Sequence, residues 1–230
     1  IEGTLNYLVN RVRNNSNGNY KNVALTMPPM YDIMHDDLVG APPDVRRLGC
    51  DASFNAYTEG IVSSPGFLED IPQRSLGMHI HISSKALNND LSKIAVKWAD
   101  VTAGVMSVAV ASNNELEARR RQYYGRAGEH RLNIYASGNS GFEYRVISSD
   151  VMRHNALLTF MFHLVREAAY TALGTHKTPD DDITKEAIYI INTCDKSRIP
   201  AYLKEFAERY LQHDRFMVEK MKWYAKHGKM

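Results

Sequence analysis

The stretch Gly77-Met78-His79-Ile80-His81-Ile82-Ser83 decides the fold, because its side chains alternate between apolar and polar. Successive side chains of a β-strand point to opposite faces, so the alternation predicts a strand with one face in a core. The polar residues His79, His81 and Ser83 would then share the outer face. Two imidazoles and a hydroxyl in this arrangement suit a metal ion or a phosphate, although the polar side of an edge strand gives the same pattern.

Three other segments are predicted as strands. Phe142–Ser148 alternates in the same way, and Arg131–Tyr135 precedes it across a turn rich in Gly, Ser and Asn at Ser137–Gly141. Gly49–Tyr57 has a mixed pattern that also favours a strand. A tight turn between two strands is typical of antiparallel pairing, so we expect a mainly antiparallel sheet.

Long helical segments surround these strands. Leu87–Ala111 and Val151–Leu173 carry apolar residues at steps of three and four. After a polar break, Ile183–Asn192 and Pro200–Tyr224 are predicted as two closing helices. The order of the segments predicts an α+β fold, in which a mainly antiparallel sheet packs with long helices and the C-terminus is helical.

Composition and charge exclude several classes of protein. The 230 residues include 28 Lys and Arg against 26 Asp and Glu, and a net charge of +2 does not indicate a nucleic-acid partner. Cys50 and Cys194 are too few and too far apart for a disulfide framework, which suits a reducing cytoplasm. No stretch is apolar for long enough to span a bilayer. We expect residues 1–175 to form the main domain and residues 176–230 a helical C-terminal extension.

A second polar string runs from Arg119 to Arg131 and contains five arginines. Guanidinium groups bind phosphate and carboxylate with two parallel hydrogen bonds and keep their charge. Gly125 and Gly128 would let the backbone approach a ligand. For residues 119–121 alone, the preferred interpretation is the solvated basic end of a helix.

A third string, Glu143-Tyr144-Arg145, lies on the last predicted strand, with Glu143 and Arg145 on the same face. Such a pair is often only a structural ion pair. It is also what a site needs when a carboxylate holds magnesium and an arginine holds an anionic substrate. The pattern by itself leaves both interpretations open.

Taken in order, the three strings resemble the catalytic domain of the glutamine synthetase superfamily. The resemblance implies that His79 is a metal ligand and that His81 and Ser83 line an ATP site. It implies a second metal ligand in Glu143, a contact to the substrate carboxylate in Arg145, and the sheet of the glutamine synthetase catalytic type.

The same resemblance assigns Arg126 and Arg131 to the transferring phosphate and the acyl intermediate, and it implies ATP and Mg²⁺ as cofactors. Together with Arg145, these two arginines are the expected catalytic residues. The function implied is a carboxylate–amine ligase that forms an amide through an acyl phosphate. Its substrates would be a small-molecule or peptide carboxylate and an amine, and a homo-oligomer is compatible with the superfamily.

Within the superfamily, the strings are similar to the phage amidoligases called carboxylate–amine ligase type 2. The strings that carry this closer similarity are Arg74–His81, Tyr124–Gly128 and Gly141–Arg145. Gly49–Ala56 is similar to a Gly-Cys-Asp-Pro-Asp-Phe segment of those proteins, which suggests Asp51 as a further metal ligand. The chain has Ala and Ser where that segment has its Pro and second Asp, so one carboxylate is lost.

The family's acidic N-terminal segments have no counterpart in residues 1–31. Either they lie upstream of Ile1 or the protein has lost them and is catalytically inactive, and we favour the first. The alternative function is a non-catalytic phage structural or binding protein descended from a ligase. A metal hydrolase using His79 and His81, and a kinase for guanidino substrates, are further alternatives. The expected location is the cytoplasm, or the host cytoplasm for a phage-encoded protein.

Overall fold

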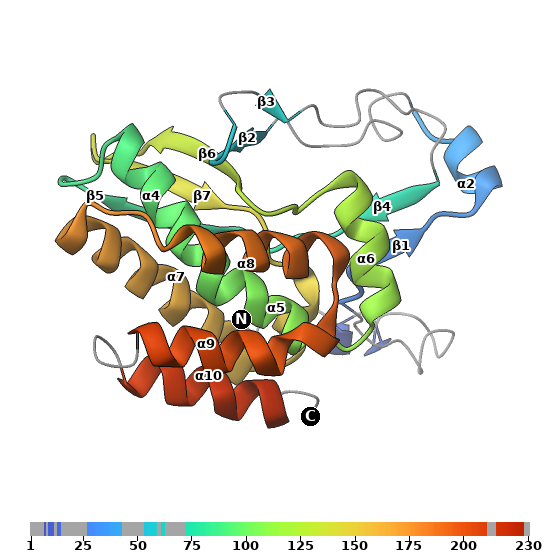
Figure 1. Cartoon of the computed structure of the whole chain (residues 1–230). Helices are drawn as coiled ribbons and strands as arrows, with labels where there is room; N and C mark the ends of the chain where they lie inside the picture. Colours follow the sequence, from blue (N-terminus) through green and yellow to red (C-terminus); the bar gives the residue numbers. More distant parts are fainter. Residues whose placement is uncertain are drawn as a thin grey trace.

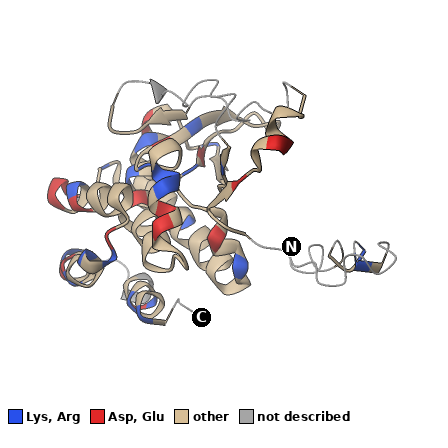
Figure 2. Cartoon of the chain, turned by 90° about the vertical axis from the view of Figure 1, so that its right-hand side faces the viewer, with Lys and Arg blue, Asp and Glu red and all other residues tan. Residues whose placement is uncertain are grey.

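The structure, a computed structural model of the chain, describes residues 7, 9–11, 13–14, 27–42, 53–58, 61–62, 72–210 and 215–227. Helices pack on one face of a five-stranded antiparallel sheet (Figure 1). The expected combination of helices with a mainly antiparallel sheet is therefore confirmed. In the view of Figure 2, basic and acidic residues are interspersed along the helices.

The large sheet has the spatial order β3-β2-β6-β7-β5. Its strands are β2 (Ser53–Asn55), β3 (Ile61–Val62), β5 (Ile80–Ser84), β6 (Glu129–Ile134) and β7 (Ser140–Tyr144). A separate pair consists of β1 (Met30–Asp32) and β4 (Gln73–Ser75). The turn predicted between β6 and β7 is present, and Gly138 adopts a φ of 77° there, which a side chain would disfavour.

The helices agree with the segments predicted over residues 87–111, 151–173 and 183–192, but the short helix at His35–Val39 was not predicted and the C-terminal segment differs. They are α2 (His35–Val39), α4 (Asn89–Ala99), α5 (Val105–Ala109), α6 (Asn114–Tyr123), α7 (Asn155–Thr175), α8 (Asp181–Thr193), α9 (Ile199–Tyr210) and α10 (Arg215–His227). Short 3-10 segments are present at Ser149–Arg153 and Lys196–Arg198. The single closing helix predicted over Pro200–Tyr224 is wrong, because α9 ends at Tyr210 and α10 begins at Arg215 and packs against it.

The apolar face of the sheet packs against α4 and α7, as the alternation predicts. Ile80, Phe142 and Tyr144 are buried there. One hydrophobic cluster continues from this face through α8 to α10, so it includes residues on both sides of residue 175. No helix among the described residues combines the length and the apolar character that a membrane crossing needs.

A buried carboxylate lies where α4 passes into a π-helical segment, Asp100–Gly104. The Tyr144 hydroxyl donates to Asp100 Oδ1 at 2.6 Å. Asp100 Oδ2 accepts from the Tyr57 hydroxyl at 2.9 Å and from the Gly128 N–H at 2.6 Å. One side chain therefore ties α4 to β7, to the end of β2 and to the turn before β6.

Burial raises the pKa of Asp100 from 3.8 to about 7, against the hydrogen bonds from Tyr144, Tyr57 and Gly128, which lower it. The unfolded chain releases this proton near pH 3.8, while the native chain holds it until about pH 7. Between these values the native state binds more protons than the unfolded state. Stability contributed by this group therefore falls as the pH rises from about 4 to about 7.

We predict that Asp100→Asn removes this pH dependence. The free energy of unfolding of the wild type, minus that of the variant, should fall by on the order of 4 kcal/mol between pH 4 and pH 7. Denaturant titrations at a series of pH values measure this difference. Asp90→Asn, which changes an exposed acid of the same helix and keeps Asp100, is the control and should retain the pH dependence of the wild type. An unchanged slope in Asp100→Asn would contradict the prediction.

Candidate functional site

Three neighbouring strands bring the predicted polar residues to one face of the sheet. Strand β7 pairs with β5 on one side and with β6 on the other, and all pairs are antiparallel. In this register Glu143 lies opposite His81 in β5 and opposite Arg131 in β6. The strings that are far apart in sequence therefore converge on Glu143, on the face that α4 and α7 do not cover.

His79, just before β5, is held by two hydrogen-bond partners. Its Nδ1 lies 2.6 Å from Glu143 Oε1, and its Nε2 lies 2.6 Å from the Tyr124 hydroxyl. The same hydroxyl accepts a hydrogen bond from Arg145 Nε. A consistent set of donors follows, in which Arg145 donates to Tyr124, Tyr124 donates to His79 Nε2, and His79 Nδ1–H donates to Glu143.

The protonation state of His79 agrees with this set. Burial lowers the pKa of His79 to about 4, and the charges of Arg145 and Arg120 act in the same direction against the raising effect of Glu143. The imidazole is therefore neutral at pH 7. A neutral imidazole has one lone pair, which is the form that binds a metal ion.

Two arginines flank the central carboxylate at different depths. Arg145 is fully buried, with Nε 3.3 Å from Glu143 Oε1. Arg131 is partly exposed, with Nη1 3.9 Å from Glu143 Oε2. Arg131 can therefore offer hydrogen-bond donors to a carboxylate or phosphate at this face, whereas the buried Arg145 contributes its charge from beneath the surface.

His79, His81 and Glu143 also form a group with the composition of a metal site. One ligand atom from each lies within 4.8 Å of the others. Two nitrogens and one carboxylate suit Mn²⁺, Zn²⁺ or Fe²⁺, whereas Mg²⁺ prefers oxygen ligands. Glu143 fits Mg²⁺, with water and phosphate oxygens as the other ligands, and the histidines fit it less well.

The remaining predicted residues have different surroundings. His81 is exposed, and its Nδ1 lies 3.1 Å from the Tyr135 hydroxyl. Ser83 is exposed on the same face, opposite Gly141 of β7. Asp51, with the segment that suggested it as a ligand, lies outside the described residues. Their expected ligand contacts stay predictions.

Arg126 is occupied at the end of α6. Its Nε donates to the Arg121 carbonyl at 2.8 Å, and its Nη2 donates to the Gln122 carbonyl at 2.9 Å. The guanidinium thereby satisfies carbonyl groups that a helix leaves without partners at its C-terminus. The structure thus places Arg131 and Arg145, but not Arg126, in contact with Glu143, and the phosphate contact of Arg126 stays a prediction.

Sequence reasoning missed two tyrosines of this face. Tyr124 connects His79 to Arg145, and Tyr135 contacts His81. Tyr124 immediately precedes Gly125, within a string that the sequence analysis singled out. The signal available in the sequence was a tyrosine directly before a glycine. The contact between Tyr124 and His79 joins residues 45 positions apart, and no periodic pattern in the sequence predicts it.

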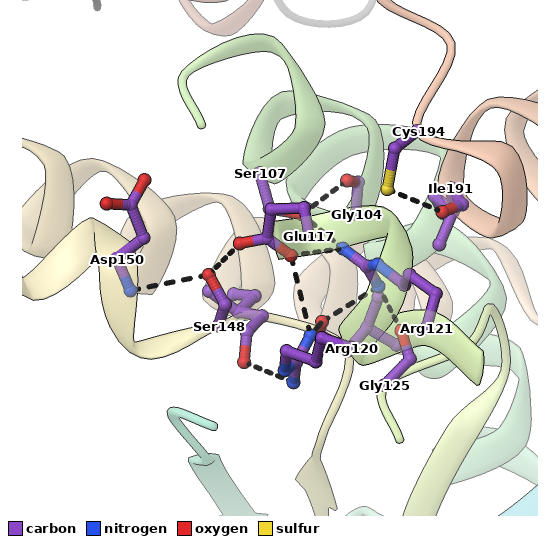
Figure 3. Close-up of polar contacts among 12 residues, drawn as sticks. Gly104, Ser107, Glu117, Arg120, Arg121, Gly125, Ser148, Asp150, Ile191 and Cys194 are labelled. Carbon is purple, nitrogen blue, oxygen red and sulfur yellow. Dashed lines mark hydrogen bonds and ion pairs between the residues drawn. The ribbon is translucent and has the colours of Figure 1, made fainter. Parts of the chain in front are cut away.

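The interpretation of residues 119–121 as a solvated helix end is wrong for two of the three arginines (Figure 3). Arg120 and Arg121 are buried, and each has one nitrogen 3.8 Å from Glu117 Oε2. Both also donate to main-chain carbonyls that follow β7, Arg120 to Val146 and Ile147 and Arg121 to Val146. Arg119 alone lies at the surface, paired with Asp32 at 3.1 Å.

Gly125 and Gly128, which we expected to let the backbone approach a ligand, instead leave room for side chains of the protein itself. Gly125 and Gly128 have φ values of 80° and 83°. A Cβ at Gly125 would lie 2.4 Å from Arg120 Nη1, and one at Gly128 would lie 2.7 Å from Asn55 Oδ1. Their missing side chains let buried arginine and asparagine pack against the turn that leads into β6.

Comparison of the chain with protein-family models, with curated proteins and with solved structures finds no match.

We predict that Arg120→Ala destabilises the protein by about 3–5 kcal/mol, because it leaves Glu117 buried with one fewer cation. It also removes donors to the carbonyls after β7. Arg119→Ala is the matched control on the same helix, and it should cost less than about 1 kcal/mol because its ion pair is exposed. Denaturant unfolding of both variants measures the difference. Equal losses would mean that burial of the Arg120 ion pair is not what stabilises α6.

Proposed function

We propose that this face of the sheet binds a metal–nucleotide complex and that the protein is an ATP- and Mg²⁺-dependent carboxylate–amine ligase. The observation that carries the proposal is the convergence of three sequence strings on Glu143. His79 and His81, Arg131, and Arg145 come from separate parts of the chain and lie around one carboxylate.

The chain's own groups fit the requirements of phosphoryl transfer. That reaction needs positive charge around the transferring group and an anchor for the cation, with little covalent work by the protein. Glu143 and His79 would hold the cation, which neutralises phosphate charge when bound. In this proposal Arg131, which is partly exposed, would contact phosphate, and Arg145, which is buried beside Glu143, would orient the substrate carboxylate.

The Tyr124 hydroxyl can hydrogen-bond to His79 Nε2 whether that nitrogen accepts or donates, so it is compatible with either tautomer of His79. If His79 held a cation through Nδ1, the single proton of the neutral imidazole would reside on Nε2, and Nε2–H would donate to the Tyr124 hydroxyl. Histidine ligands of metals almost always donate their second nitrogen to such an acceptor. The 2.6 Å contact between Tyr124 and His79 already has the required position, and the Tyr124 hydroxyl hydrogen would have to turn away from Nε2 to another acceptor.

Calorimetric titration with a non-hydrolysable ATP analogue tests the proposal, in Mg²⁺, in Mn²⁺ and with a chelator. We expect cation-dependent binding by the wild type. His79→Ala and Glu143→Gln should each weaken it by roughly ten- to a hundredfold, because each removes a contact to a charged group. His154→Ala, which changes an exposed histidine at the start of α7, is the control and should bind normally.

Thermal unfolding of each variant separates loss of binding from loss of the fold. Binding that is the same with chelator, or equal in His79→Ala and the wild type, would contradict the proposed site. A folded wild type with no nucleotide affinity would favour the non-catalytic alternative. Where binding is present, product analysis with candidate carboxylates and amines distinguishes ligation from phosphorylation.

A further inference from the structure

The helices farthest from the sheet form a second concave site. A cavity of about 710 Å³ lies between α5, α9 and α10. Figure 1 shows α9 and α10 separated from the sheet by the layer that contains α5 and α8. The cavity is therefore separate from the candidate site around Glu143, which lies on the face of the sheet that α4 and α7 do not cover. Its volume lies in the range of small-molecule sites.

The floor of this cavity is apolar. Ile199, Leu203 and Ala207 of α9 line it, and each is buried in the protein core. Ala109 of α5 and Ala225 of α10 complete the floor, and their small side chains leave the space open. An apolar ligand surface placed here would be removed from water, which is favourable in proportion to the area buried.

The rim of the cavity is strongly basic. Lys196, Lys204, Lys222 and Lys226 line it, against the single carboxylate of Glu208. Lys222 is paired with Glu219 at 3.2 Å, and Lys196 Nζ donates to the Ala111 carbonyl at 2.5 Å. Lys204 of α9 and Lys226 of α10 are exposed and form no ion pair or hydrogen bond with the described residues.

We propose that this cavity binds a small amphiphilic anion. Its apolar body would lie on the floor formed by Ile199, Leu203 and Ala207, and its single anionic head group would lie beside Lys204 and Lys226. The lysines of the rim favour an anionic head group over a cationic one. The apolar floor favours a molecule with a hydrocarbon body over a free inorganic anion. This site goes beyond the proposed ligase function and does not depend on it.

Calorimetry with decanoate as the probe tests the proposal. We expect one saturable site, no binding of acetate, and an affinity for decanoate that exceeds that for octanoate by on the order of tenfold, because two methylenes are buried. Decyltrimethylammonium, which carries the same tail and the opposite charge, should bind at least about tenfold more weakly than decanoate.

Two variants and a control connect the binding to this cavity. Lys204→Glu combined with Lys226→Glu changes only exposed side chains and should weaken decanoate binding by on the order of tenfold. Ala225→Trp should block the cavity and abolish binding, with unchanged melting as the check on folding. Lys185→Glu, an exposed lysine of α8 outside the cavity, should bind decanoate as the wild type does.

Several results would overturn the proposal. These are the absence of saturable binding, equal affinity for the cationic amphiphile, or wild-type affinity in the double lysine variant. Vesicles with and without anionic lipid provide a last comparison. If the lysine variant lost affinity for anionic vesicles and kept its affinity for monomeric decanoate, the rim would be a membrane-facing surface and the cavity assignment would be wrong.

Discussion

The register of β7 against its two neighbours is the constraint on which the candidate site depends. Glu143 meets His81 on one side and Arg131 on the other because Ile80 pairs with Tyr144 and His130 pairs with Tyr144. A shift of one residue would turn every side chain of a strand to the other face. It would place Glu143 in the apolar layer against α4 and bring Phe142 or Tyr144 to the polar face. The core therefore enforces the geometry of the site.

A second constraint holds the end of β7 in place. Beyond Tyr144 the regular pairing of β7 ends, with one further bridge between Gly77 and Ser148. The main-chain carbonyls there accept from Arg120 and Arg121 of α6. Burial lowers the pKa of Arg120 to about 10, against the raising effect of Glu117, and the side chain stays charged at neutral pH. Arg145 belongs to the segment that these two arginines anchor. The buried ion cluster of Figure 3 thus supports the position of Arg145 relative to His79 and Tyr124.

The sequence predicted the features that follow a repeating pattern of apolar and polar residues, and it missed those that depend on contacts between distant segments. The alternation in Gly77–Ser83 identified the face of β5 that carries His79 and His81, because side-chain direction in a strand repeats every two residues. The break between α9 and α10 was missed, since amphipathic spacing continues on both sides and no Gly or Pro occurs in residues 201–224. Helix α6 buries a glutamate and two arginines instead of an apolar stripe, so composition suggested a solvated surface. These arginines can be buried because main-chain carbonyls of a distant segment accept their hydrogen bonds, and the local sequence pattern does not reveal such distant partners.

The charge of the site decides which form of a ligand it favours. With a neutral His79, the groups around Glu143 are one carboxylate and the two guanidinium groups of Arg131 and Arg145, which leaves a net charge of +1. Nearby, the two buried carboxylates Glu117 and Glu129 balance Arg120 and Arg121, so the excess positive charge lies at Arg131 and Arg145. A bare divalent cation would enter a positive environment, in which its approach to Glu143 competes with two arginines. A cation that arrives bound to a polyphosphate carries net negative charge, and the same arginines then attract it. If the face binds a cation as proposed, its charge therefore favours a metal–anion complex over a free metal ion.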